Sequence, residues 1–165
     1  MLMMNIVLHE PEMPANTGNI GRTCMAAGAR LHLIAPLGFR LDEKSLKRAG
    51  LDYWHDLDVT LYDSYADFLD RNPGITLYMA TTKGRRLYTE VAWGPDSWMM
   101  FGRESAGIPE EILVRHPDTA IRIPMNPGIR SLNLANSVAI VLYEALRQQD
   151  FACMQREGQL HRLHW

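Results

Sequence analysis

Residues 97–107 have the sequence SWMMFGRESAG, an apolar run that ends in a polar, glycine-rich loop. Such a run of uncharged residues, five long here (97–101), is typical of a strand that is buried on both faces of a sheet. Two similar runs, at Asn5–His9 (NIVLH) and 76–80 (TLYMA), predict further strands of this kind. Helix-like stretches alternate with the strands, which indicates an α/β fold: a parallel sheet with helices on both faces.

The other elements follow from local start and stop signals. We expect strands at 31–35, 59–62 and 120–123, and helices at 17–27, 42–49, 64–71, 108–115 and 132–149. Thr17 is expected to cap the first helix, which Gly28 would end. Gly50 is expected to end the second helix.

Composition limits the class of protein. The chain has 165 residues, 47% of them hydrophobic, which predicts one domain (1–150) with a core and a tail (151–165) of unknown role. No window approaches the ~18 consecutive apolar residues of a membrane span, so no membrane contact is expected. The two cysteines, Cys24 and Cys153, form no metal-type spacing, which favours a reducing, cytoplasmic location and no metal.

The net charge of −2 means that any contact with nucleic acid must be local. Basic residues gather in two places, at Lys44, Lys47 and Arg48 and at Lys83, Arg85 and Arg86. Taken alone, each cluster is more typical of a solvated surface than of a binding site.

The last expected helix carries six successive uncharged residues, 138–143 (VAIVLY). An ordinary surface helix has one apolar stripe about 100° wide. The sheet can cover one face of this helix, and we expect a second subunit to cover the other, which predicts a homodimer. The alternative is a helix buried wholly within one chain.

Three polar loops follow predicted strands: 14–22 (PANTGNIGR), 101–107 (FGRESAG) and 123–133 (IPMNPGIRSLN). Open α/β sheets bind ligands at the carboxyl ends of their strands. None of the loops has the phosphate-binding or dinucleotide spacing of glycines. Ser131 has no evident His/Asp partner for nucleophilic catalysis, and His161-x-x-His164 is more typical of a solvated tail than of a metal site.

Together these loops resemble the three motifs of the SPOUT RNA methyltransferases, 2′-O-ribose branch. The resemblance is carried by NTGNIGR (16–22), FGRESAG (101–107), and IPM (123–125) with SLNLANS (131–137). It extends over nearly all of residues 1–149, and PEMPANTGNIGR, KRAGLDYW and ATTKG are similar to the small members that act on the tRNA wobble position. Two residues depart from the branch: Arg103, where proline or a small residue is common, and Ala106, where a basic residue is common.

The resemblance implies a fold and a cofactor that composition cannot show. It implies a deep C-terminal trefoil knot, a rare topology. It also implies S-adenosylmethionine, bound in a bent conformation near a dimer interface. The implied cofactor residues are Ala80, Thr81, Gly102, Gly107, Ile123, Met125, Ser131 and Leu132.

The resemblance also makes Arg22 the catalytic residue, a role that is described in the family as a general base. A guanidinium is protonated in proteins, and holding one neutral across 5 pH units would cost about 7 kcal/mol. A charged Arg22 that grips the adjacent phosphate and stabilises a developing alkoxide is physically easier. Asn16, Glu104 and Asn133 would form a polar shell that orients Arg22 and the loops, although each could simply fix a loop.

The implied reaction is 2′-O-methylation of nucleotide 34, cytidine or modified uridine, in leucine tRNAs. A single-stranded loop suits a small protein without a broad basic face, because its 2′-hydroxyls are accessible. The first motif begins at Asn16, which we expect leaves no room upstream for an extra RNA-binding domain. The expected RNA contacts are Lys83, Arg85, Arg86, Arg130 and Tyr143. The alternatives are 2′-O-methylation at another tRNA or rRNA position and a non-catalytic assembly factor that binds RNA or the cofactor.

Overall fold

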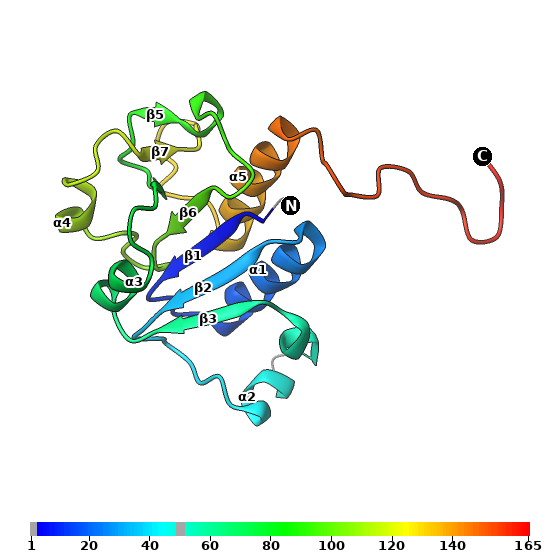
Figure 1. Cartoon of the computed structure of the whole chain (residues 1–165), viewed down its shortest axis with the longest axis horizontal. Coiled ribbons are helices and arrows are strands. Elements are labelled where there is room, and N and C mark those ends of the chain that lie inside the picture. Colours follow the sequence, from blue (N-terminus) through cyan, green and yellow to red (C-terminus); the bar gives the residue numbers. More distant parts are fainter. Residues whose placement is uncertain (1–2, 49–51) are drawn as a thin grey trace.

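The computed structural model describes residues 3–48 and 52–165 (Figure 1). One sheet contains β1 (Asn5–His9), β2 (Arg30–Ile34), β3 (Val59–Tyr62), β4 (Leu77–Ala80), β5 (Arg86–Leu87), β6 (Trp98–Phe101) and β7 (Ala120–Arg122). Their order is β3-β2-β1-β6-β4-β7-β5, and every recorded strand pair is parallel. The expected parallel α/β sheet is confirmed.

Helices cover both faces of this sheet (Figure 1). They are α1 (Pro14–Ala27), α2 (Glu43–Arg48), α3 (Tyr65–Arg71), α4 (Glu110–Leu113) and α5 (Leu134–Gln148), with the 3-10 helices η1 (Asp52–Asp56) and η2 (Tyr88–Glu90). Successive strand residues point to opposite faces. Ile6 and Leu8 therefore pack with α1 and α5, whereas Val7 packs with α3 and α4.

The first helix begins one turn earlier than expected. Met13 is its N-cap and Pro14 occupies the first turn, where proline has no amide to leave unpaired. The prediction that Thr17 is the N-cap is therefore wrong, because Thr17 lies inside α1 and is buried. Gly28 ends the helix at a φ of 66°, as expected.

Other boundaries differ in a similar way. α5 begins after its N-cap Asn133, whose side chain accepts a hydrogen bond from the amide of Asn136. The helix expected at 108–115 spans only Glu110–Leu113, after Pro109. The expected end of α2 at Gly50 lies outside the described residues. Neither β5 nor the two 3-10 helices were predicted, since each is too short to show a period.

Helix α5 buries one face within its own chain. Val138, Val141 and Leu142 are fully buried, whereas Ile140 and Tyr143 are 36% and 40% exposed. The sheet thus covers one face, as expected, and the alternative of a wholly buried helix is wrong. In the part of the chain that is described, no helix is long and apolar enough to cross a membrane.

Candidate functional site

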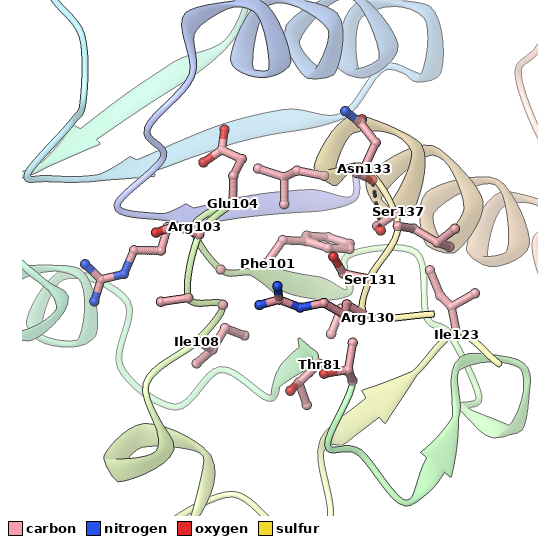
Figure 2. A pocket seen from close by; sticks show the side chains of 18 of the residues that line it. Thr81, Phe101, Arg103, Glu104, Ile108, Ile123, Arg130, Ser131, Asn133 and Ser137 are labelled. Atoms are coloured by element: carbon pink, nitrogen blue, oxygen red, sulfur yellow. Dashed lines mark hydrogen bonds between the residues drawn. The ribbon is translucent and has the colours of Figure 1, made fainter. Parts of the chain in front are cut away.

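A pocket of about 580 Å³ lies at the carboxyl ends of β4, β6 and β7 (Figure 2). Its walls are the segments 80–83, 101–108 and 130–134, together with Met13, Asn16, Ile123, Met125 and Ser137. All of the cofactor residues expected from the sequence line it: Ala80, Thr81, Gly102, Gly107, Ile123, Met125, Ser131 and Leu132. The fold therefore brings these residues together from three distant segments.

Glycine at position 102 allows two stretches of backbone to touch. A Cβ built on Gly102 would lie 2.2 Å from both the carbonyl carbon of Gly107 and the amide nitrogen of Ile108. Gly107 has a φ of 69°, a conformation that side chains disfavour, and its amide donates to the carbonyl of Arg103 at 2.9 Å. The loop 102–107 thus folds back tightly and forms one wall of the pocket.

Two carboxylates tie this loop to the segment before α1. Glu104 accepts hydrogen bonds from the backbone amides of Glu12 at 2.9 Å and Met13 at 3.1 Å. In return, Glu12 accepts from the Ser105 hydroxyl at 2.7 Å and the Ser105 amide at 2.9 Å. These bonds from Ser105 lower the pKa of Glu12. The reciprocal arrangement holds the loop in one place.

The other two members of the expected polar shell complete this network. The amide group of Asn16 donates to Glu104 at 3.2 Å, and that of Asn133 donates to the side-chain oxygen of Asn16 at 3.1 Å. All three residues line the pocket. Glu104 therefore has three N–H donors, and the network connects the start of α1, the 102–107 loop and the start of α5.

Arg22 lies apart from this network. It is exposed on α1 and is not among the pocket-lining residues. Its guanidinium carbon is 5.3 Å from the ring centroid of Tyr53, and the Tyr53 hydroxyl donates to the carbonyl of Gly18 on α1. Asn16, Glu104 and Asn133 bond to one another and not to Arg22 within the described chain. The expectation that they orient Arg22 therefore has no support from contacts within one subunit. A cation over an aromatic face is attracted to it, and Tyr53 supplies that partner instead.

Only some of the residues expected to contact RNA lie at the pocket. Arg130 and Lys83 line the pocket, whereas Arg85, Arg86 and Tyr143 do not. Lys83 forms an ion pair with Glu110 at 2.9 Å, and this pair lowers the pKa of Glu110. Arg86 donates to the carbonyl of Glu90 at 2.8 Å.

Arg103, which departs from the resembling branch, points away from Ser131 and Arg130 (Figure 2). It pairs with Glu10 at 2.9 Å. Within residues 3–48 and 52–165, no group of three or more His, Cys, Asp or Glu side chains could hold a metal ion.

Sequence reasoning missed several residues of the site. Phe101, Ile108 and Ser137 line the pocket. Glu12 bonds to the 102–107 loop through Ser105, and Tyr53 contacts Arg22. Phe101 and Ile108 flank the second loop and could have been inferred from their neighbours. Glu12 and Tyr53 carry no local signal, because their partners are distant in the sequence.

Comparison with known proteins gives consistent matches. The model of the SpoU rRNA Methylase family matches residues 3–143. The tRNA (cytidine(34)-2′-O)-methyltransferase of Escherichia coli is 48% identical over 147 residues, which cover 88% of this chain and 94% of that protein. The protein of the same name from Saccharophagus degradans is 47% identical over 151 residues, covering 91% of this chain and 98% of that protein.

Solved structures agree with these matches. A structure described as giving insight into the 2-OH methylation of C/U34 on tRNA has a TM-score of 0.84 at 45% identity, covering 90% of this chain and 97% of that one. The SpoU methyltransferase AviRb from Streptomyces viridochromogenes, in complex with AdoMet, has a TM-score of 0.77 at 25% identity. That match covers 93% of this chain and 60% of AviRb.

Proposed function

The chain belongs to the SpoU rRNA Methylase family, and from this premise we propose that it transfers the methyl group of S-adenosylmethionine to the 2′-hydroxyl of tRNA nucleotide 34. Two observations carry the proposal. The three segments that resemble the methyltransferase motifs meet in one pocket, and relatives that span nearly the whole chain bear the name of this activity.

The pocket residues suit the cofactor. Ligand sites typically have volumes of ~300–1,000 Å³ and combine apolar walls with a few polar groups. Here Phe101, Ile123 and Leu132 offer apolar surface, while Thr81 and Ser131 offer hydroxyls. When bound, S-adenosylmethionine supplies an electrophilic methyl group.

We assign positioning roles to Asn16, Glu104 and Asn133. Both oxygens of Glu104 already accept hydrogen bonds from N–H groups, so this carboxylate is poorly placed to take the proton from a ribose hydroxyl. Its contacts instead set the position of the loop 102–107. Asn16 and Asn133 extend the same support to the start of α5.

We assign Arg22 to the RNA. A guanidinium stays protonated and can grip a phosphate through two parallel hydrogen bonds while it stabilises negative charge on the attacking oxygen. Arg22 does not line the pocket of its own subunit. This position favours a homodimer in which Arg22 of one subunit contacts RNA at the pocket of the other. The exposed Ile140 and Tyr143 on α5, which packs beside α1, offer an apolar surface for that contact.

A mixed dimer tests this assignment. A subunit with Arg22→Ala is combined with a subunit whose pocket is blocked by Gly102→Val. If Arg22 acts across the dimer, the mixed dimer regains methyl transfer that neither parent has. Activity that stays absent would place Arg22 in service of its own pocket, or outside the reaction.

The finer features also belong to the proposal. We infer a trefoil knot formed by the pocket segments, a cytoplasmic location, and leucine tRNAs with cytidine or modified uridine at position 34 as substrates. The test combines purified enzyme, labelled cofactor and tRNA from cells that lack the gene, followed by nucleoside mass spectrometry. We expect a 2′-O-methylated nucleotide at position 34. Label elsewhere in tRNA or in rRNA would revise the substrate, and no transfer would favour a non-catalytic assembly factor.

A further inference from the structure

Helix α2 presents a basic face to solvent. Lys44, Lys47 and Arg48 are exposed, and the last two lie three and four residues after the first, which places them on one side of the helix. Leu46 is buried on the opposite side. The helix is thus anchored by its apolar side, and its basic side is held outward.

These three charges form no ion pair in the described part of the chain, whereas six of the other 14 lysines and arginines do. Arg30, Arg71, Lys83, Arg103, Arg147 and Arg156 form ion pairs with carboxylates. Among the described residues, none pairs with Lys44, Lys47 or Arg48. Two acidic neighbours reduce the net charge of this helix: Glu43 is exposed one turn before Lys47, and Asp42 accepts hydrogen bonds from the amide and hydroxyl of Ser45, both at 2.9 Å. Such a set of free cations in a chain of net charge −2 is suited to an anionic partner.

The basic face is physically connected to the pocket. The segment that leads into α2 is held against the segment before α1, because the Gly38 amide donates to the carbonyl of Pro11 at 2.9 Å. A Cβ on Gly38 would lie 2.4 Å from the carbonyl oxygen of Glu12, the residue that is bonded to the 102–107 loop. After α2, η1 brings Tyr53 beside Arg22. Figure 1 shows α2 beyond β3, at one edge of the sheet.

We propose that Lys44, Lys47 and Arg48 bind phosphates of the substrate RNA outside the nucleotide that is methylated. This inference rests on the proposed function. It adds an electrostatic contact on the α1–α2 side of the pocket, whereas Lys83 on the other side is already paired with Glu110. Together with Arg22 of the other subunit of the proposed dimer, the face would hold the RNA strand on either side of the reacting ribose.

The expected effect follows from counterion release. Each phosphate contact on a single strand contributes a slope of about 0.7 in log K against log salt, which is about 5-fold in affinity at 0.1 M salt relative to 1 M. The double variant Lys44→Gln with Lys47→Gln should therefore bind tRNA about 25-fold more weakly at 0.1 M salt, with the slope lowered by about 1.4. The control variant, Arg115→Gln with Arg162→Gln, removes the same charge from exposed sites elsewhere.

The measurement is fluorescence anisotropy of labelled, unmodified tRNA over a series of salt concentrations. Calorimetry with S-adenosylmethionine checks that the pocket of each variant is intact. A larger loss of affinity and of slope in the α2 variant than in the control supports the proposal, and equal losses overturn it. If the unmodified protein neither binds nor methylates tRNA, the proposed function fails as well. Normal methylation with equal binding by both variants overturns only the role of α2.

Discussion

Replacing Gly102 by alanine should damage cofactor binding far more than the addition of one methyl group suggests. The new Cβ would lie 2.2 Å from the backbone of Gly107 and Ile108, whereas ordinary contacts begin at 3.4 Å. The two stretches of backbone must therefore separate by about 1.2 Å, the difference between these values. Neither atom belongs to a flexible side chain that could turn away.

The loop resists such a movement because it is bonded on both sides. Glu104 is held by the amides of Glu12 and Met13, and Gly107 by the carbonyl of Arg103. Overpacking of this kind costs about 1–3 kcal/mol. If that cost falls on the conformation that binds S-adenosylmethionine, the affinity drops by about 5- to 150-fold.

Isothermal calorimetry with S-adenosylmethionine and thermal unfolding would measure the two consequences. Gly158→Ala is the matched control, because its Cβ would meet nothing within 4 Å. Wild-type affinity and wild-type stability in Gly102→Ala would refute the view that this backbone contact shapes the pocket.

Three further predictions concern the network, a buried histidine and the exposed face of α5. Glu104→Gln should lower stability by about 1.5–3 kcal/mol in thermal unfolding, since an amide nitrogen would face backbone donors; an unchanged melting temperature would contradict this. Burial lowers the pKa of His32 to about 4 from its ordinary 6.5, so only the unfolded chain takes up this proton between those values. Stability should thus fall by about 3 kcal/mol as the pH drops from 6.5 to 4, and denaturant titrations of His32→Gln should show a smaller fall. Ile140→Glu should yield folded monomers by light scattering and circular dichroism, and a dimer that persists would place the interface elsewhere.

The local pattern of apolar and polar residues was sufficient to predict much of the fold and the segments that line the pocket. The apolar runs around Val7, Met79 and Met100 are buried strands because a central parallel strand is covered on both faces. The loops that follow such strands converge on one edge of the sheet, so the resemblance of their motifs located the pocket. The start of α1 was misplaced because Thr17 offers a capping side chain, whereas the tertiary structure buries it.

The sequence by itself determined the α/β class, the strands of the core and the segments that line the pocket, because these depend on hydrophobic period and on strand direction. Only the tertiary structure decided which polar groups meet. Glu104 reaches Asn16, and Asn16 reaches Asn133, across long stretches of chain, while Arg22 rests on Tyr53 outside the pocket. It also paired Lys83 with Glu110 and left the cations of α2 free. Contacts of this kind depend on how distant elements pack, and a side chain carries no local sign of the partner that packing will bring to it.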